Sequence, residues 1–256
     1  MLKANVILVA GGTGLIGSAC INRLRSLGYN KILAPLKKEV DYLNFEIFSE
    51  YCMNNSVTHM IFAAGKVGGI LDNNNNQVNY LINNSILAIN AIKVSIDCNL
   101  KKVVLFGSSC MYPIDAMQPF RENDILTGPM EKTSLGYALS KLLLTQGACL
   151  ANKANNYDTF FIPVIPNSCY GPNDNFDPKT SHVLSALVGK IIKAKENNDE
   201  YVTLFGTGAP HREFIYSNDV ADAVIFLMEN LNEKPNTSIN IGSGEEISIL
   251  NLAKKI

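Results

Sequence analysis

The feature that most constrains the fold of this chain is a glycine pattern directly after its first apolar segment. Residues 6–10 are Val-Ile-Leu-Val-Ala, a run typical of a buried strand, and Gly11, Gly14 and Gly17 follow at regular spacing. Glycines so placed permit a tight turn, close approach of the main chain to a pyrophosphate, and close packing of the next helix, whose N-terminus attracts the anion. The pattern predicts a dinucleotide-binding turn; the alternative is a glycine-rich turn with a structural role. The expected contacts are Gly11, Thr13, Gly14, Leu15, Ile16 and Gly17.

The end of the expected second strand indicates which dinucleotide is bound. NAD-binding proteins usually carry an acidic residue there, which holds the ribose 2′-hydroxyl. This chain has Ala34-Pro35-Leu36-Lys37-Lys38 instead, without a carboxylate and with two lysines. Lys37 and Lys38 favour a 2′-phosphate, so NADP is expected. NAD is the alternative, since exposed lysines are often only a solvated surface.

Short apolar runs rich in β-branched residues alternate along the chain with longer segments of helical spacing. Strands are expected at 6–10, 31–36, 59–63, 102–106, 159–164 and 238–241, and helices at 18–27, 45–53, 79–98 and 135–152. Gly28 is placed to end the first helix. This alternation is typical of βαβ units, so it predicts an α/β fold with a Rossmann-like doubly wound parallel sheet.

After Pro166 the pattern is less regular and richer in glycine and proline. We expect residues 1–166 to form an NADP-binding Rossmann domain, to which about 213–244 return. Residues 167–212 and 245–256 are expected to form a small C-terminal substrate lobe. Residues 245–256 have the pattern of an amphipathic helix capped by Ser248 and cut off in mid-course, so the lobe is expected to be truncated. The asparagine run 73–76 is interpreted as a loop or the entry to a helix.

Composition limits the partners and the compartment. Lys plus Arg number 22 against 23 Asp plus Glu, which makes nucleic acid an unexpected partner. The six cysteines have neither a CxxC pair nor zinc-ligand spacing, so we expect no metal, no disulfide framework, and a reducing, cytoplasmic location. No stretch approaches the ~20 apolar residues of a membrane span, so no membrane association is expected.

Tyr137 and Lys141 lie four residues apart in a segment of helical spacing, so their side chains share one face. A tyrosine with an ordinary pKa of ~10 exchanges protons poorly at neutral pH, and a nearby cation stabilises its phenolate. Lys141 is therefore expected to tune Tyr137 for proton transfer. The alternative is a pair of surface residues, because this spacing is common by chance.

Hydroxyl groups follow the strand expected at 102–106, in the segment Gly107-Ser108-Ser109-Cys110. The carboxyl edge of an open α/β sheet is where ligands bind. Together, the glycine turn, Ser108 and the Tyr-x-x-x-Lys pattern resemble the extended short-chain dehydrogenase/reductase family over the full length of the chain.

Further segments resemble the GDP-L-fucose synthases within that family, namely residues 63–70 (Ala-Ala-Gly-Lys-Val-Gly-Gly-Ile), 107–113, 166–176, 181–183 and 212–214. This resemblance implies a bifunctional enzyme that takes GDP-4-keto-6-deoxy-D-mannose, inverts C3 and C5, and reduces the C4 ketone with NADPH to give GDP-L-fucose. It implies that Cys110 and His182 are the base and acid of epimerisation, that Tyr137 protonates the C4 oxygen, that Ser108 hydrogen-bonds that oxygen, and that Lys141 tunes the phenol. It also implies cofactor contacts at Ala63, Ala64, Tyr137, Lys141 and His182, and substrate contacts at Asn167, Val183, Lys190 and Arg212.

The residue types suit this chemistry. A proton next to a ketone becomes removable only if the charge that develops on oxygen is stabilised, which Ser108 and Tyr137 can do. Inversion needs a base and an acid on opposite faces of the sugar. A thiol and an imidazole titrate nearest to neutrality, although Cys110 could instead be an inert core residue and His182 a packing or capping residue. We interpret Cys20, Cys52, Cys98 and Cys149 as inert and His59 as structural.

Two departures from the family pattern stand out. Gly65 replaces a more usual alanine, which is expected to loosen the loop near the nicotinamide, and Pro35 takes the place of an arginine that can contact a 2′-phosphate. The resemblance also suggests a homodimer through the helices at 79–98 and 135–152. Two other functions stay open: an epimerase or reductase for another GDP-sugar, such as a GDP-6-deoxy-heptose, and a non-catalytic dinucleotide-binding protein.

Overall fold

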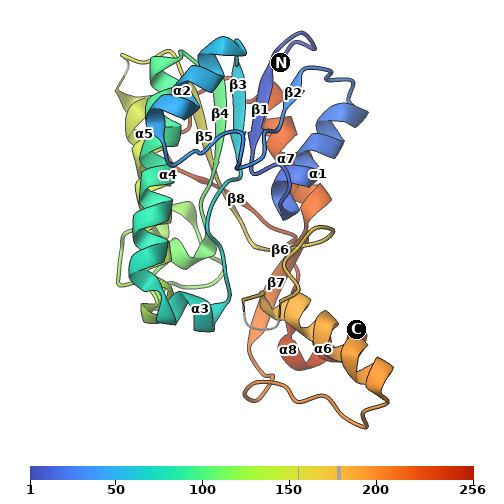
Figure 1. Cartoon of the computed structure of the whole chain (residues 1–256). Helices are drawn as coiled ribbons and strands as arrows, with labels where there is room; N and C mark the ends of the chain where they lie inside the picture. Colours follow the sequence, from blue (N-terminus) through green and yellow to red (C-terminus); the bar gives the residue numbers. More distant parts are fainter. Residues whose placement is uncertain (155, 178–179) are drawn as a thin grey trace.

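A six-stranded parallel sheet forms the centre of the molecule, in the order β2-β1-β3-β4-β5-β8 (Figure 1). The structure is a computed structural model and describes residues 1–154, 156–177 and 180–256. The strands are β1 (Ile7–Ala10), β2 (Ile32–Leu33), β3 (His59–Phe62), β4 (Lys102–Phe106), β5 (Phe160–Pro166) and β8 (Ile239–Ile241). The expected α/β fold with a Rossmann-like doubly wound parallel sheet is confirmed.

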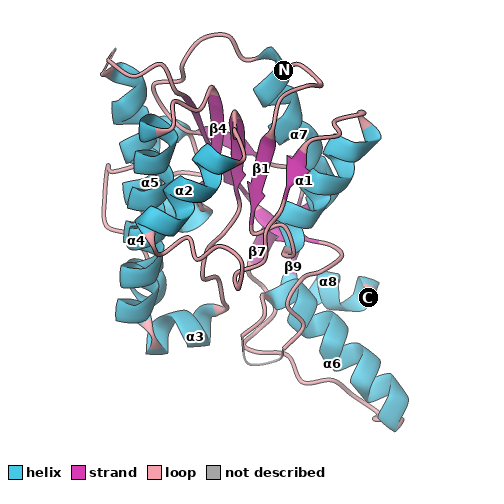
Figure 2. Cartoon of the chain, turned by 45° about the horizontal axis from the view of Figure 1, so that its top comes forward, coloured by secondary structure: helices cyan, strands magenta, loops and turns pink. Residues whose placement is uncertain are grey.

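Helices cover both faces of this sheet, as Figure 2 shows. One face packs against α1 (Leu15–Ser26) and α7 (Ser217–Asn230), and the other against α2 (Phe45–Asn54), α4 (Gln77–Asp97) and α5 (Leu135–Lys153). Each face has its own apolar core, and the strands alternate their buried side chains between the two. Strands buried on both faces consist of continuous apolar residues, which is why these strands could be predicted from the sequence.

The strand order reverses between β1 and β3, because β2 lies on one side of β1 and β3 on the other. Ligands of open α/β sheets bind outside the carboxyl ends of the strands at such a reversal. The glycine turn after β1 and the Ala63-Ala64 pair after β3 both follow strands that end there. The topology therefore places the two expected cofactor segments side by side.

A smaller second unit faces the carboxyl ends of the strands (Figure 1). It contains a sheet in the order β6-β7-β9, made of β6 (Ser168–Tyr170), β7 (His211–Tyr216) and β9 (Glu246–Ser248), with α6 (Val183–Asn197) and α8 (Ile249–Lys255). The remaining elements are α3 (Ile70–Asn75) and the short 3-10 helices η1 (Ser109–Met111), η2 (Glu122–Asp124) and η3 (Lys132–Ser134). The asparagine run expected to be a loop or a helix entry lies mostly in α3.

Two expected elements differ from the structure. The strand expected at 31–36 is limited to Ile32–Leu33, because Pro35 has no N–H to donate and the chain turns where Glu39 and Val40 donate to the Leu36 carbonyl. The helix expected at 245–256 begins only after β9, which pairs antiparallel with β7. Ser248 caps that helix as expected, accepting the Asn251 N–H at 3.2 Å.

The domain division at 166, 213 and 245 stays a prediction, with one difference in detail. Residues 213–216, expected to return to the first domain, belong to β7 of the small sheet. The return to the large sheet is made by α7 and β8. In the part of the chain that the structure describes, no helix combines the length and apolar character needed to cross a bilayer.

The buried histidine at the start of β3 predicts an acid-sensitive stability. His59 is 3% exposed, and burial, together with Lys101 and Lys102, lowers its pKa from 6.5 to about 4. The unfolded chain therefore takes a proton that folded His59 does not, so stability is full above pH ~6.5 and falls as the pH drops toward 4. Between pH 7 and pH 5, we expect protonation of His59 in the unfolded chain to lower the free energy of unfolding by about 2 kcal/mol.

Urea unfolding at pH 7 and pH 5, for the wild type and His59→Gln, measures this effect. The glutamine variant loses stability through packing at both pH values but has no imidazole to protonate. Its decrease between the two pH values is therefore expected to be smaller. An equal decrease in both proteins would assign the acid sensitivity to other groups.

Candidate active site

The glycine turn forms a cradle at the N-terminus of α1. Gly11 has φ +77°, and a Cβ there would lie 2.8 Å from main-chain atoms of Ala63 and Ala64. A Cβ at Gly17 would overlap the Gly11 carbonyl oxygen, whereas one at Gly14 would meet nothing within 3.4 Å. Gly14 is the N-cap of α1 and offers no capping side chain, so the first N–H groups of the helix are available to an anion. The cradle fits a pyrophosphate.

The turn after β2 presents both expected lysines to solvent. Lys37 and Lys38 are exposed, and neither forms a salt bridge with a described carboxylate. The sequence interpretation did not include Glu39, whose carboxylate accepts the Leu36 N–H at 2.7 Å. Glu39 thus closes the turn that carries the lysines.

Ser108, Tyr137 and Lys141 converge where β4 meets α5. Ser108 follows β4 and accepts the Cys110 N–H at 3.3 Å, which starts η1. Lys141 is buried, and its Nζ donates to the Phe106 carbonyl at 2.8 Å and lies 5.6 Å from the Tyr137 ring centroid. The Ser108 hydroxyl is hydrogen-bonded to the phenol of Tyr137. The hydroxyl, phenol and ammonium are therefore assembled as the sequence predicts.

Burial dominates the electrostatics at Tyr137. Burial raises the pKa of its phenol, with a further increase from the nearby Cys110 thiol, and only the hydrogen bond from Ser108 opposes this. Burial also lowers the pKa of Lys141 to about 8, and its ammonium donates to the Phe106 carbonyl. Tyr137 is consequently a neutral phenol, the form that can donate a proton.

Cys110 is set apart from the other cysteines by position. It is half-buried in η1, within electrostatic range of Tyr137. Cys20, Cys52 and Cys149 are buried, and burial raises the pKa of the Cys20 and Cys52 thiols to about 12, in agreement with inert core residues. Cys169, to which the sequence interpretation gave no role, also lies near Tyr137 and donates to the Asn167 carbonyl at 3.2 Å.

The loop after β3 is tied to side chains of α4 by hydrogen bonds of Lys66, the residue after Gly65. Asn84 of α4 accepts the Lys66 N–H at 2.8 Å and donates to the Lys66 carbonyl at 3.0 Å. Lys66 also donates to Asn79 at 2.9 Å. The sequence analysis did not single out Asn84. The feature that could have identified it is a polar amide on the buried face of α4, between the core residues Tyr80 and Ala88.

His182 is the N-cap of α6 and is exposed. Desolvation lowers its pKa, and Asp174 opposes that shift. The Asp174 carboxylate also accepts the hydroxyl of buried Ser185 in the first turn of α6. The sequence interpretation overlooked Asp174 and Ser185.

The four expected substrate residues lie in or next to the second unit. Val183 is exposed at the start of α6, and Lys190, further along α6, has its Nζ 4.9 Å from the centroid of the exposed Phe205 ring. Arg212 is exposed in β7, and it forms no salt bridge with a described carboxylate, as is also true of Lys190. Asn167 instead donates to Glu213 at 2.6 Å and accepts the Ser168 N–H at 2.9 Å. These bonds hold Asn167 against β6 and β7, while its own N–H donates to the Ile241 carbonyl of β8 at 3.0 Å.

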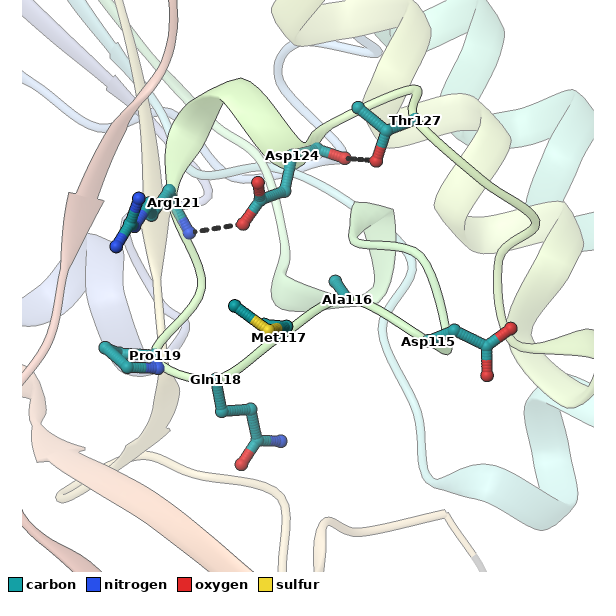
Figure 3. A pocket seen from close by; sticks show the side chains of 8 residues that line it. All are labelled: Asp115, Ala116, Met117, Gln118, Pro119, Arg121, Asp124 and Thr127. Atoms are coloured by element: carbon teal, nitrogen blue, oxygen red, sulfur yellow. Dashed lines mark hydrogen bonds between the residues drawn. The ribbon is translucent and has the colours of Figure 1, made fainter.

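Two surface hollows lie among the described residues. One, of about 290 Å³, lies in the loop between β4 and α5 and is lined by Asp115, Ala116, Met117, Gln118, Pro119, Arg121, Asp124 and Thr127 (Figure 3). The other, of about 270 Å³, is lined by residues of α6 and the following loop, including Lys190 and Tyr201. Neither is lined by the groups around Tyr137. No group of three or more His, Cys, Asp or Glu among the described residues could hold a metal ion.

Comparison with known proteins agrees with this geometry. Residues 7–242 match the NAD dependent epimerase/dehydratase family. The chain is 39% identical to the GDP-L-fucose synthase of Sinorhizobium fredii, over 99% of this chain and 79% of that protein. It is 36% identical to the GDP-L-colitose synthase of Yersinia pseudotuberculosis, over 98% and 80%.

Solved structures give the same result. A GDP-L-fucose synthetase from Naegleria fowleri bound to NADP has a TM-score of 0.90 at 29% identity, covering 99% of this chain and 77% of that one. A GDP-mannoheptose C4 reductase from Campylobacter jejuni with NADP bound has a TM-score of 0.86 at 29% identity, covering 99% and 84%. The chain therefore belongs to the NAD dependent epimerase/dehydratase family, among the relatives of GDP-L-fucose synthase.

Proposed function

We propose that this protein converts GDP-4-keto-6-deoxy-D-mannose to GDP-L-fucose, by inverting C3 and C5 and then reducing the C4 ketone. The observation that carries the proposal is the convergence of Ser108, Cys110, Tyr137 and Lys141 at the carboxyl end of β4, where the second unit faces the sheet. This set combines a proton donor for a ketone oxygen with a thiol that can act on the neighbouring carbon. A reductase without epimerisation needs no such thiol.

NADP is the proposed cofactor, and when bound it supplies the hydride as NADPH. The cradle formed by Gly11, Gly14 and Gly17 suits its pyrophosphate, and Thr13, Leu15 and Ile16 complete that turn. Lys37 and Lys38 are exposed cations for the 2′-phosphate. Ala63 and Ala64 lie against the turn, and Tyr137, Lys141 and His182 are proposed to lie near the nicotinamide.

Epimerisation is proposed to use Cys110 and His182 on opposite faces of the sugar. Cys110 as thiolate removes the proton from the carbon beside the ketone, and the electron pair moves to the ketone oxygen. Ser108 and Tyr137 donate hydrogen bonds to that oxygen, which stabilises the enediolate. Protonated His182 returns a proton to the opposite face, and the carbon is inverted.

Reduction follows at C4. The neutral phenol of Tyr137 donates its proton to the C4 oxygen as the hydride reaches the carbon. Lys141, with a pKa of about 8, is mainly protonated at pH 7 and lies 5.6 Å from the Tyr137 ring centroid. Its charge stabilises the phenolate that remains.

The GDP part is proposed to bind along the second unit. Arg212 presents a planar set of donors that suits a diphosphate, and Lys190 provides a second cation. The exposed ring of Phe205 beside Lys190 offers an aromatic face to the guanine base. Val183 and Asn167 are proposed to complete the substrate contacts.

Purified protein incubated with NADPH and GDP-4-keto-6-deoxy-D-mannose tests this function directly. NADPH oxidation is followed at 340 nm, and the nucleotide-sugar product is identified by NMR. Formation of GDP-L-fucose is expected. No NADPH oxidation by a folded sample that binds NADPH would exclude the proposed substrate.

A second candidate is an epimerase or reductase for a related GDP-sugar. Its support is that the relatives include proteins named for colitose and for heptoses, among them a GDP-6-OMe-4-keto-L-xylo-heptose reductase from C. jejuni with TM-score 0.88 at 28% identity. Competition between GDP-4-keto-6-deoxy-D-mannose and a 4-keto GDP-heptose, compared as kcat/KM, separates the two. A non-catalytic role receives no support from the assembled Ser108, Tyr137 and Lys141. The cytoplasmic location stays a prediction.

The division of labour between thiol and phenol predicts a selective defect in Cys110→Ser. A serine is a much weaker base than a thiolate, so inversion at C3 and C5 is expected to fall about 10²–10⁴-fold. Hydride transfer to the ketone needs Tyr137 and is expected to fall less. Product NMR together with NADPH oxidation measures both, and an equal decrease in both would contradict the separate roles.

A homodimer through α4 and α5 is the proposed assembly. The two helices pack together, and each carries a stripe of apolar side chains exposed in the single chain: Val78, Ile82, Ile86 and Ile89 on α4, and Leu139, Leu143 and Leu150 on α5. These stripes follow helical spacing. A second copy of the same pair of helices would cover them, and such a self-complementary face suits a two-fold dimer.

The double substitution Ile86→Glu with Leu143→Glu tests the dimer. Burying two carboxylates without partners is expected to weaken association by about 100-fold or more, roughly 2.7 kcal/mol. Light scattering after size-exclusion chromatography measures the mass. Phe226→Glu is the matched control, because Phe226 is 63% exposed on α7, away from this face. A monomeric wild type, or dimeric double variant, contradicts the proposal.

A further inference from the structure

A main-chain bridge joins the loop after β3 to the turn that precedes His182. The Gly69 N–H donates to the Thr180 carbonyl at 2.8 Å, and a Cβ at Gly69 would lie 2.6 Å from the Ser181 carbonyl oxygen. Gly69 has φ −68° and ψ 175°, a conformation that any residue adopts. Glycine is therefore required here by the close approach of two backbones and not by backbone geometry.

The Gly69 side of this bridge is rigid. Buried Asn73 donates to the Gly68 carbonyl at 2.6 Å and to the Gly69 carbonyl at 3.2 Å. The fully buried Tyr80 donates to Asp72, and a Cβ at Gly68 would overlap the Tyr80 hydroxyl. An added methyl at Gly69 would therefore displace the turn at 180–182 more readily than the loop.

The other side of the bridge leads directly to His182. Its carbonyl accepts the Ala186 N–H at 2.9 Å and so begins α6, and Asp174 holds the first turn of that helix through Ser185. Because α6 is anchored after His182 and the bridge holds the chain before it, a displacement at Ser181 is taken up at His182 itself. A displacement of about 1 Å can cost roughly 100-fold in rate at a reacting group.

We infer that Gly69 is a positioning residue for His182: its bare main chain, bonded to Thr180, sets where the imidazole stands relative to the dinucleotide domain. The inference rests on the proposed function, in which His182 returns the proton that completes inversion. Ser108, Cys110, Tyr137 and Lys141 all belong to the dinucleotide domain and are not moved by this bridge. A methyl at residue 69 thus impairs inversion while proton removal by Cys110 and hydride transfer continue.

The test separates three events in one reaction. Gly69→Ala is incubated with GDP-4-keto-6-deoxy-D-mannose and NADPH in D₂O. NADPH oxidation reports hydride transfer, deuterium at C3 and C5 reports proton removal, and the product's configuration reports inversion. Relative to NADPH oxidation, the inverted fraction is expected to fall about tenfold or more, with deuterium incorporation retained. His182→Asn is expected to show the same signature, whereas Cys110→Ser loses deuterium incorporation.

Gly189→Ala is the matched control, because it adds a methyl to α6 itself, where the nearest atom outside the local helix backbone is the Phe176 carbonyl oxygen at 3.6 Å. Its inverted fraction is expected to equal that of the wild type within about twofold. A wild type that oxidises no NADPH with this substrate overturns the proposed function. A working wild type with an unchanged inverted fraction in Gly69→Ala, or with deuterium incorporation lost alongside inversion, overturns the inference alone.

Circular dichroism shows whether Gly69→Ala folds. If it does not, Asn73→Ala is the second variant that tests the inference. It removes the amide that holds the Gly68 and Gly69 carbonyls and adds no atoms to the bridge. A smaller decrease of the same ratio, about threefold or more, is expected because the loop then holds Thr180 less firmly. An inverted fraction equal to that of the wild type in this variant overturns the inference.

Discussion

Replacing Tyr137 with phenylalanine is expected to reduce kcat for NADPH oxidation by about 10²–10⁴-fold, because the C4 oxygen loses its proton donor. The phenol lies with Ser108 and Lys141 at the end of β4, and burial keeps it neutral. The ring itself remains, so its edge-on contact with Tyr80 is kept. NADPH affinity is expected to change little, which fluorescence titration of NADPH measures alongside steady-state kinetics.

Tyr112→Phe is the matched control for this result. Tyr112 is also buried, lies in the same loop region after β4, and donates to Asn240 at 2.6 Å, away from the proposed ketone site. Its loss is expected to cost about 1 kcal/mol of stability through one hydrogen bond and to leave kcat nearly unchanged. Retention of wild-type kcat by Tyr137→Phe would remove the tyrosine from the proposed mechanism.

Replacing Gly17 with alanine is expected to damage both folding and cofactor binding. The added methyl would overlap the Gly11 carbonyl oxygen and lie 2.7 Å from the Gly11 carbonyl carbon, so α1 must move away from the turn. Such overpacking costs about 1–3 kcal/mol of unfolding free energy. Because the N-terminus of α1 is part of the cradle, the Kd for NADPH is expected to rise about tenfold or more, roughly 1.4 kcal/mol.

Gly14→Ala separates the two effects. A methyl there has the Gly11 carbonyl oxygen at 3.5 Å as its nearest protein contact. Its unfolding free energy is therefore expected to stay within about 0.5 kcal/mol of the wild type, while NADPH binding weakens because the methyl stands at the open side of the cradle. Chemical denaturation and NADPH titration measure both quantities. A Gly17→Ala protein with wild-type stability and affinity would show that α1 does not depend on this close approach.

Local patterns in the sequence determined the large sheet and much of the candidate site. Strands buried on both faces are continuous apolar runs, and helices show their own period, so β1, β3, β4 and the helices α1, α2, α4 and α5 could be located from residues alone. The glycine turn and the four-residue spacing of Tyr137 and Lys141 are local as well. Each of these patterns lies within a few consecutive residues, so each could be interpreted without a structure.

Contacts between distant residues were decided only by the tertiary structure. The strands of the small sheet are short and partly exposed, so β6, β7 and β9 have little apolar signal of their own and form by pairing. The raised pKa of the Tyr137 phenol depends on its burial and on the neighbouring Cys110 thiol, which no spacing rule contains. The approach of Gly69 to Thr180 joins residues more than a hundred positions apart. A sequence specifies such an approach only through the packing of everything between, whereas its helices, strands and turns follow from neighbouring residues.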